Sequence, residues 1–313
     1  MTPANTINFR QSILNCLGEF PEKPAPDFKI DSSEQKPGYI RHKVSYNVEA
    51  GERVNAILLT PEKTTVKSPA ILALHQHNGQ WDLGKSEVEG TAGEPMYAYG
   101  LDLCLRGYVV LCPDHLAFEE RIPDYFRKEP GNLQGYERFA FCKYVQDGKC
   151  LQTKYIHDLS VALDILEQLN SVDSSRIGVI GHSLGGQETL WITWYDDRVK
   201  AAVSSCGFGK ISTIFRDYVL HNFAMYIPGM AAIGDIDDLV QDIAPHPFAM
   251  TSGTEDIIFP IDGVREIVEK AEKTYRAKGK AENFLPVIFD AGHSFPDDVK
   301  TRVYNWLDAI LKK

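Results

Sequence analysis

The sequence predicts an α/β protein with a mostly parallel central sheet of about eight strands and helices on both faces. Three observations lead to this prediction. Strand-length apolar runs alternate with helix-length patterns along most of the chain, an order that favours parallel strands joined by helices. Several of these runs are apolar throughout, as in strands that are covered on both faces. The 313 residues are 43% hydrophobic and 24% charged, which is enough for one large buried core.

The first 37 residues differ from the rest of the chain. Apolar side chains recur with helical spacing at residues 7–17, and a proline-rich stretch follows them. We therefore expect residues 1–37 to form a helix and a connector, and residues 38–313 to form the main domain. The prolines of the connector are Pro21, Pro24, Pro26 and Pro37.

The main domain opens with two strands. Residues 39–48 alternate between apolar and polar side chains, as a half-buried strand does. Residues 53–60 form a second strand, which Pro61 ends because proline cannot donate to a sheet. Ala50 and Gly51 lie between the two, so the sequence predicts an antiparallel hairpin there.

Strands and helices alternate through the remainder of the chain. Short apolar runs predict six more strands, at residues 69–75, 108–112, 176–180, 199–204, 248–252 and 284–289. Helical spacing predicts helices at residues 96–106, 154–169, 184–195, 261–278 and 296–311. Gly107 is a typical residue after a helix, and Pro113 halts the strand that follows it.

Two long segments interrupt this alternation. Residues 114–150 look irregular, aromatic and charged, and residues 206–245 contain helical pieces. Both are too long for plain connections, and segments of this kind are usually functional or disordered. We expect them to be insertions that cap a binding site.

Charge and hydropathy exclude some classes of partner. With 33 basic and 43 acidic residues, the net charge is −10, whereas nucleic-acid binders show a basic face. The N-terminus lacks a basic region followed by an apolar run, so no secretory signal is expected. No apolar run approaches the length of a membrane span. We expect neither a nucleic-acid nor a membrane partner.

The six cysteines point to a reducing compartment. Cys104, Cys112 and Cys206 have apolar or small neighbours, where free thiols pack as small hydrophobic groups. A chain of this length needs no disulfide to fold. The sequence therefore predicts reduced thiols and a cytoplasmic location, with Cys142 and Cys150 as the one pair left open.

The strongest chemical signal is the run Gly181-His182-Ser183-Leu184-Gly185, which reads G-x-S-x-G. In this motif a serine sits on a sharp strand-to-helix turn, and the small residues keep the turn free of clashes. A glycine-rich turn with an incidental serine is the alternative. The motif lies between a predicted strand and a predicted helix, as it must, so we expect Ser183 to be a nucleophile.

A serine hydroxyl needs a base to take its proton, and the base needs an acid to orient it. His293 follows the last predicted strand, beside Gly292. Asp256 follows the strand before it, in the chain order serine, acid, histidine. We expect His293 to be the base and Asp256 the acid. The competing acids are Glu255, Asp235, Asp237, Asp238 and Asp242.

Acyl transfer also needs N–H donors for the negative oxygen that develops on the carbonyl. One is expected from Leu184, at the start of the helix after the nucleophile. The other should come from the loop after residues 69–75, with His77 as first choice and Gln76 as the alternative. His75 and His77 have a spacing seen in metal sites, but no carboxylate lies at a compact spacing beside them. No metal or other cofactor is expected.

These segments together resemble the α/β-hydrolase superfamily, and within it dienelactone-hydrolase-like and acetyl-xylan-esterase-like members. The resemblance extends from about residue 38 to the C-terminus and implies a carboxylic-ester hydrolase with the triad named above. Gln76 departs from the family's frequent His-Gly, and the serine replaces the cysteine of dienelactone hydrolases proper. The motifs that carry it are residues 74–79, 181–186, 253–256 and 291–293.

The two insertions are expected to supply substrate contacts. The first begins at a strand end, which places His115 and Arg121 at the rim of the site. Arg121 could bind a substrate carboxylate through two parallel bonds, with a surface salt bridge as the alternative. Phe208 in the second insertion could line an apolar pocket, although aromatic residues there also suit the core of a lid.

The predicted function is hydrolysis of a carboxylic ester of a small or medium soluble substrate, through an acyl-enzyme on Ser183. A peptidase or amidase of the same fold is an alternative, as is a binding protein on a hydrolase scaffold. The sequence leaves the acyl and alcohol groups open. It also leaves open whether the chain forms a homo-oligomer.

Overall fold

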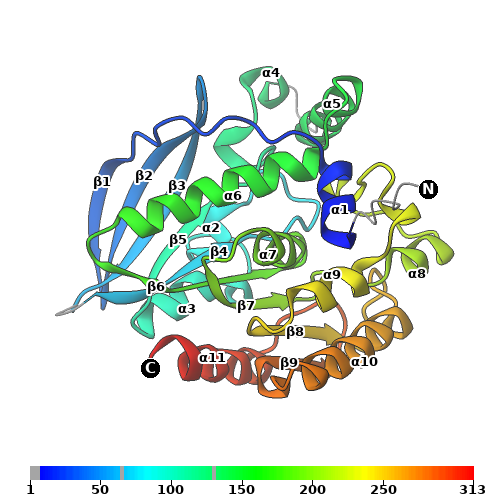
Figure 1. Cartoon of the computed structure of the whole chain (residues 1–313). Coiled ribbons are helices and arrows are strands. Elements are labelled where there is room, and N and C mark those ends of the chain that lie inside the picture. Colours follow the sequence, from blue (N-terminus) through cyan, green and yellow to red (C-terminus); the bar gives the residue numbers. More distant parts are fainter. Residues whose placement is uncertain (1–7, 64–66, 129–131) are drawn as a thin grey trace, which may run out of the picture.

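The computed structural model describes residues 8–63, 67–128 and 132–313 and contains a single nine-stranded sheet (Figure 1). The strand order is β1-β2-β3-β5-β4-β6-β7-β8-β9. The first three strands and β5 pair antiparallel, and β5 to β9 form the parallel part. The strands are β1 (Lys29–Lys36), β2 (Tyr39–Glu49), β3 (Glu52–Pro61), β4 (Ser68–Leu74), β5 (Val109–Pro113), β6 (Val172–His182), β7 (Val199–Ser205), β8 (Phe248–Gly253) and β9 (Phe284–Phe289).

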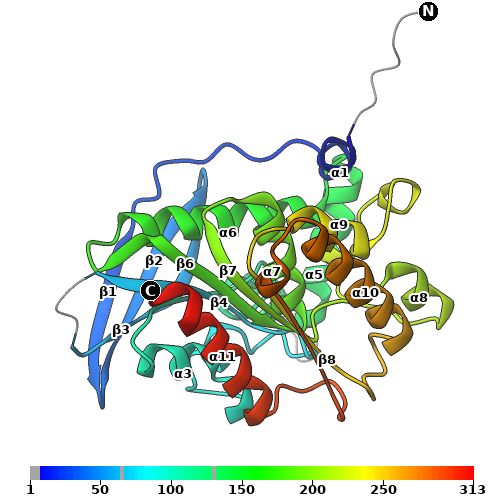
Figure 2. The same ribbon diagram turned by 60° about the horizontal axis from the view of Figure 1, so that its bottom comes forward.

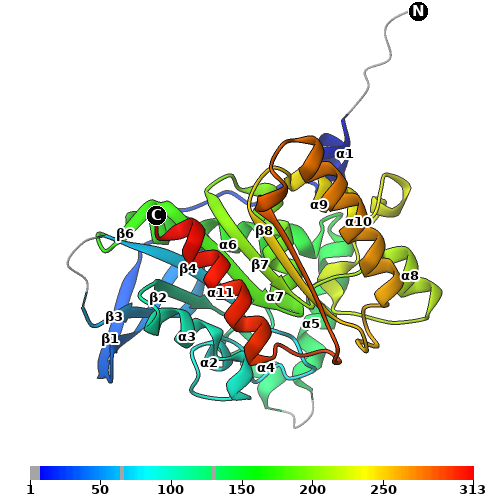
Figure 3. The same cartoon turned by 90° about the horizontal axis from the view of Figure 1, so that it is seen from below.

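Helices cover both faces of the sheet, which confirms the predicted fold class. One core packs α1, α6, α7, α9 and α10 on one face, and a second packs α3 and α11 on the other. Figures 2 and 3 show α3 and α11 in front of the sheet. These helices are α1 (Phe9–Leu17), α3 (Tyr99–Leu105), α6 (Leu151–Gln168), α7 (Leu184–Tyr195), α9 (Ile236–Ile243), α10 (Ile261–Ala277) and α11 (Asp297–Leu311).

The N-terminal segment corrects one prediction. Residues 29–36, expected as part of a connector, form the edge strand β1, which pairs antiparallel with β2. Nearly every side chain of β1 is exposed, so its sequence carries no apolar alternation. Backbone hydrogen bonds to β2 hold it, and its charged side chains suit an open sheet edge. The sheet therefore has nine strands, and the first 37 residues contribute one of them.

The first insertion is more helical than expected, the second contains helical pieces as expected, and the two meet beside the sheet. Residues 114–150, predicted to be irregular, contain two helices besides a short 3₁₀ turn. Side chains from both insertions pack in a third apolar cluster that includes Phe118, Tyr155, Leu184 and Ala224. The helices of the insertions, apart from α9, are α4 (Asp124–Arg127), α5 (Leu133–Gln146) and α8 (Ile211–Arg216), with 3₁₀ turns η2 (Glu119–Arg121), η3 (Phe223–Met225) and η4 (Met230–Ala232).

Three short helical elements complete the described part of the chain. The elements are α2 (Lys85–Val88), η1 (Pro95–Tyr97) and η5 (Ala281–Asn283). All six cysteines are free, including Cys142 and Cys150. Among the helices that the structure describes, none combines the length and apolar character needed to span a bilayer.

Candidate active site

The nucleophile motif forms the expected strand-to-helix turn. Strand β6 ends at His182, α7 begins at Leu184, and Ser183 between them has φ 54° and ψ −119°. A positive φ is unusual for a residue with a side chain and is characteristic of strained functional turns. The turn also needs close backbone approach, because a Cβ on Gly185 would overlap the carbonyl oxygen of Leu74. These contacts explain the glycine of the motif.

Asp256 and His293 are joined by a hydrogen bond. They follow β8 and β9, and His293 Nδ1 lies 2.7 Å from Asp256 Oδ2. The other oxygen, Oδ1, accepts from the backbone N–H groups of Ile258 (3.0 Å) and Phe259 (3.3 Å). Because an ionised carboxylate can only accept hydrogen bonds, the imidazole proton of His293 is assigned to Nδ1. Nε2 of His293 is then an acceptor, and it is buried without a partner in the described part of the chain.

The competing acids have other partners or face solvent. Glu255 is exposed beside the acid. Asp235 and Asp238 cap the N-terminus of α9. Asp237 pairs with a lysine of α10, and Asp242 accepts from the side chains of an arginine and a tryptophan.

His182, the residue before the nucleophile, packs behind His293. The two rings lie 4.7 Å apart between centroids, and Tyr97 lies at the same distance on His182. Burial lowers the pKa of His182 well below its usual value, and its Nδ1 lies 2.9 Å from Ser205 Oγ. His182 is therefore a neutral packing group.

Ser183 and His293 line one cavity of about 370 Å³. Its wall comes from the loop after β4, from α5 and from the segment before η3, so both insertions shape it. The other lining residues are His77, Asn78, Gly79, Trp81, Glu137, Leu220, His221, Asn222, Phe223 and Ile258.

His77 and Leu184, the expected oxyanion donors, have different surroundings from Gln76, the alternative to His77. His77 lines the cavity, and Leu184 begins α7 next to Ser183. Within the described residues, neither backbone N–H donates to another protein group. Gln76 is buried away from the cavity, where its amide donates to Glu87 Oε1 (3.0 Å).

Three predicted substrate contacts are wrong, because each side chain turns into the protein. Arg121 is buried against Asp158 (2.7 Å) and Glu52, so it is neither a substrate ligand nor a surface salt bridge. His115 is buried and stacks on a tyrosine of α6. Phe208 is buried and stacks on a phenylalanine of β8. None of the three lines the cavity.

Sequence reasoning missed a carboxylate in the cavity wall. Glu137 of α5 accepts from His77 Nε2 (2.8 Å), Trp81 Nε1 (2.9 Å) and the N–H of Phe223 (3.2 Å). It thereby joins the loop after β4 to the second insertion. A single glutamate in a segment without recognisable periodicity carries no local signal, so only the folded structure could reveal this role.

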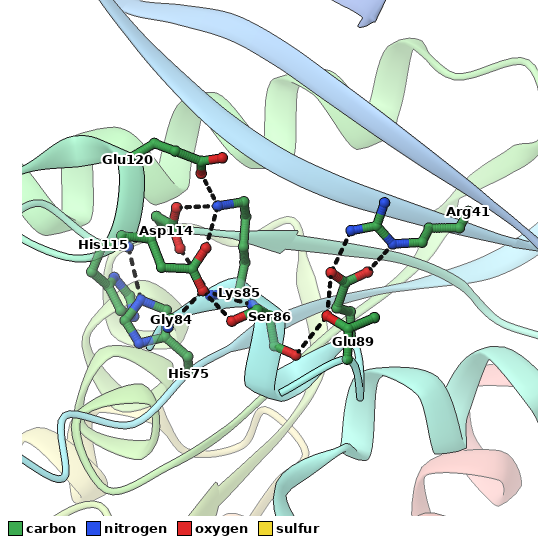
Figure 4. A network of polar contacts seen from close by, with 11 residues as sticks. Arg41, His75, Gly84, Lys85, Ser86, Glu89, Asp114, His115 and Glu120 are labelled. Carbon is green, nitrogen blue, oxygen red and sulfur yellow. Dashed lines mark hydrogen bonds and ion pairs between the residues drawn. The ribbon is translucent and has the colours of Figure 1, made fainter. Parts of the chain in front are cut away.

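A buried lysine and three carboxylates anchor the far end of the loop that follows β4 (Figure 4). Lys85 Nζ donates to Asp114 (2.6 Å), Glu119 (2.5 Å) and Glu120. The backbone N–H of Lys85 donates to Asp114 as well, and that of Gly84 to Glu119. These bonds tie the start of α2 to the segment after β5.

Replacing Lys85 with methionine is expected to lower the free energy of unfolding by about 3–5 kcal/mol, because it leaves carboxylates buried without their cation. Urea denaturation at neutral pH measures this loss. Lys143→Met, which removes an exposed lysine of α5, is the matched control and should change stability by less than about 1 kcal/mol. Equal small effects of the two changes would contradict the assignment.

Two groups of side chains at or near the site have ligand atoms close enough to hold a metal ion, within 4.8 Å of one another. In the first, burial raises the pKa of Cys206 to about 12, so its thiol stays protonated and is a poor ligand at neutral pH. In the second, the Lys85 ammonium already lies among the carboxylates. The groups are Cys206–Asp256–His293 and Asp114–Glu119–Glu120.

A buried polar chain connects α7 to the cavity. Glu188 accepts from Gln152 (2.6 Å) and Gln187 (3.2 Å), and Gln187 accepts from the amide of the cavity residue Asn222 (3.0 Å). Burial raises the pKa of Glu188 to about 8. The carboxyl group is therefore neutral at pH 7 in the folded protein.

This shift predicts that Glu188→Gln stabilises the protein as the pH rises. The unfolded glutamate loses its proton near pH 4.3, whereas the folded one keeps it to about pH 8. Between these values the parent loses stability by about 1.4 kcal/mol per pH unit from this group. The glutamine variant has no such loss, so its advantage in urea midpoint should grow from pH 5 to about pH 8.

The control for this prediction is Glu272→Gln, on the exposed part of α10. Its stability difference from the parent should be small and nearly independent of pH over the same range. A constant difference for Glu188→Gln would show that the two states of the parent bind the proton equally well.

The sequence matches one protein family over most of its length and a bacterial protein over nearly all of it. Residues 54–309 match the dienelactone hydrolase family. A Bacillus subtilis (strain 168) protein that bears the name hydrolase YtaP is 29% identical over 287 residues, covering 91% of this chain and 92% of that protein.

Two solved structures share the architecture. A protein from Bacteroides fragilis NCTC 9343, named as an acetyl xylan esterase, has a TM-score of 0.74 at 18% identity, with 96% of this chain and 80% of that chain covered. A glucuronoyl esterase from Solibacter usitatus has a TM-score of 0.70 at 18% identity, with 96% and 91% covered. These matches establish the α/β-hydrolase fold. The family match, which spans most of the sequence, confirms the predicted enzyme class: the chain is a hydrolase and belongs to the dienelactone hydrolase family.

Proposed function

We propose that this protein hydrolyses a carboxylic ester of a small or medium soluble substrate through an acyl-enzyme on Ser183. One observation carries the proposal: His293, which is hydrogen-bonded to Asp256, lines the same cavity as a serine held on a strained turn. Nε2 of His293 is the acceptor for the serine proton, because Nδ1 is committed to Asp256. This pairing of nucleophile, base and acid is what acyl transfer requires.

The reaction runs in two steps. Ser183 Oγ attacks the ester carbonyl while its proton passes to His293 Nε2, and the N–H groups of His77 and Leu184 stabilise the oxyanion. The tetrahedral intermediate then expels the alcohol, which takes the proton from Nε2, and the acyl-enzyme remains. A water molecule gives a proton to Nε2 and attacks the acyl group. Collapse of the second intermediate returns the proton to Ser183 and releases the acid.

The names of the two solved structures support an ester over an amide as the bond that is cleaved. One is named as an esterase of acetylated xylan and the other as an esterase of glucuronoyl groups. Both point to an acyl group linked to a hydroxyl. The cavity volume of about 370 Å³ suits a small or medium group near the nucleophile.

A fluorophosphonate probe tests the proposal. We expect one covalent adduct per chain, seen by intact mass and located at Ser183 by peptide mapping, with loss of hydrolysis of 4-nitrophenyl acetate. Ser212→Ala, an exposed serine of the second insertion, should label as the parent does. An unlabelled protein that still hydrolyses the ester, or an adduct on another serine, would overturn the proposal.

A further inference from the structure

We propose that the buried carboxylate of Glu137 makes this cavity select against substrates that carry a negative charge, in favour of esters with uncharged or cationic groups. The inference rests on the proposed esterase function and names the substrate class. It depends on three points: that Glu137 is ionised, that its partners are neutral, and that the rest of the wall does not compensate its charge.

The hydrogen bonds of Glu137 hold it in the ionised form. The carboxylate is 2% exposed and accepts three N–H groups, from His77, Trp81 and Phe223. Burial by itself favours the neutral acid, but the three N–H donors favour the carboxylate, whose oxygens only accept. Hydrogen bonds from several N–H groups favour the ionised form of a carboxyl group over its neutral form, even when the group is buried.

The histidine that contacts Glu137 does not cancel its charge. His77 Nδ1 accepts the backbone N–H of Gly79 at 3.0 Å, so that nitrogen carries no proton. The single ring proton is on Nε2, where it is donated to Glu137. The bond between His77 and Glu137 therefore joins a neutral imidazole to an anion, and the pair keeps a full negative charge.

The remaining wall adds no cation. His221 donates from Nε2 to the carbonyl of Ile258 (2.8 Å), and burial lowers its pKa below the usual value, so its ring is neutral. Asp256 adds a second carboxylate directly behind His293. The lining that the structure describes contains no lysine or arginine. Glu137 thus faces the cavity without a lysine or arginine in the described lining to offset its charge, and Asp256 lies behind His293.

A charge inside such a cavity is felt more strongly than it is in water, because the surrounding protein has a low dielectric constant. A carboxylate on the substrate would be repelled by Glu137, and no cation of the described wall would offset the repulsion. An uncharged group meets no such penalty, and a cation gains from it. The buried Arg121, once expected to bind a substrate carboxylate, is held by acids elsewhere.

Three acetate esters of one size test the inference: 4-acetoxybenzamide, 4-acetoxybenzoate and 4-acetoxy-N,N,N-trimethylanilinium. Each kcat/KM is divided by the rate constant of hydroxide hydrolysis, which removes the difference in leaving group. We expect the anion to react at least ~10-fold less well than the amide, and the cation at least as well as the amide.

Glu137→Gln separates charge from positioning. Loss of support for the loop would slow all three esters alike and leave their ratios unchanged. Loss of the charge brings the anion within about threefold of the amide, whatever the overall rate. Glu272→Gln removes the same charge from the outer surface of α10 and should leave the ratios as they are in the parent.

The outcomes are distinguishable. Equal corrected rates for the anion and the amide in the parent would overturn the inference while leaving the esterase function intact. An anion penalty that persists in Glu137→Gln would also overturn it. Failure of a folded parent to hydrolyse any of the esters, together with failure to react with a fluorophosphonate, would overturn the proposed function on which it rests.

Discussion

Ser183→Ala is expected to reduce kcat for a good ester substrate by at least ~10⁴-fold, to a residual rate that comes from binding and the oxyanion donors. In the proposed mechanism the hydroxyl of Ser183 forms the covalent bond to the acyl group, and no second nucleophile replaces it without a large loss. Its removal acts on the chemical step, so KM should change far less than kcat. Steady-state kinetics with 4-nitrophenyl acetate measure both.

The fold should survive this substitution. Ser183 lies in the cavity wall, and its strained backbone is held by glycines and by the bond from its N–H to the carbonyl of Ser205 (2.8 Å), which alanine keeps. We expect the urea midpoint of the variant to stay close to that of the parent. Ser294→Ala, one residue after His293, is the matched control and should retain most of the activity. A folded Ser183→Ala variant with more than about 1% of the parent kcat would rule out the acyl-enzyme on this serine.

The parts of the site that could be predicted from the sequence are those with strict local requirements. A strand-to-helix turn at Ser183 needs small neighbours, and Gly185 meets a backbone oxygen if it gains a Cβ. Asp256 and His293 each follow a strand that is apolar enough to be recognised. Because parallel strands end at the same edge of a sheet, their order along the chain implied that these residues would meet.

The parts that were missed lack such local requirements. Strand β1 is polar and exposed, and backbone pairing with β2 holds it, so its residues show no pattern. Helix α5 has Gly135 in its first turn and buries few of its side chains. Its position depends on apolar contacts between two insertions that are far apart in sequence. Periodicity within one segment cannot report such contacts.

The substrate contacts illustrate the same limit. Arg121 and His115 were expected at the rim because they follow a strand end, but the chain turns inward there and buries both. Glu137 and His221 take their place in the wall, and both come from insertions. Strand ends predict where an active site lies, whereas the residues that line it depend on how the insertions pack.

Asp256→Asn is expected to lower kcat by about 10⁴-fold, although the two side chains have nearly the same size and shape. The reason lies in the two oxygens of the carboxylate. Oδ1 accepts from the N–H groups of Ile258 and Phe259, and Oδ2 accepts from His293. An asparagine keeps its single oxygen where two backbone donors require it, and so it presents its NH₂ group to the histidine.

That arrangement reverses the imidazole. Nδ1 of His293 must then accept a hydrogen bond from the asparagine NH₂ group, so the ring proton moves to Nε2. A protonated Nε2 cannot take the proton of Ser183, and the nucleophile loses its base. The residual rate should rise with pH more steeply than the parent rate does, since hydroxide can replace the missing base. A pH profile of kcat for both proteins checks this expectation.

Glu255→Gln is the decisive companion, because Glu255 is the adjacent acid in the same loop. Its side chain is exposed, whereas the bond to His293 Nδ1 comes from Asp256 at 2.7 Å. We therefore expect Glu255→Gln to keep kcat within a few-fold of the parent while Asp256→Asn loses nearly all activity. The reverse result would transfer the orienting role to Glu255, and it would require the loop after β8 to turn by one residue when substrate binds.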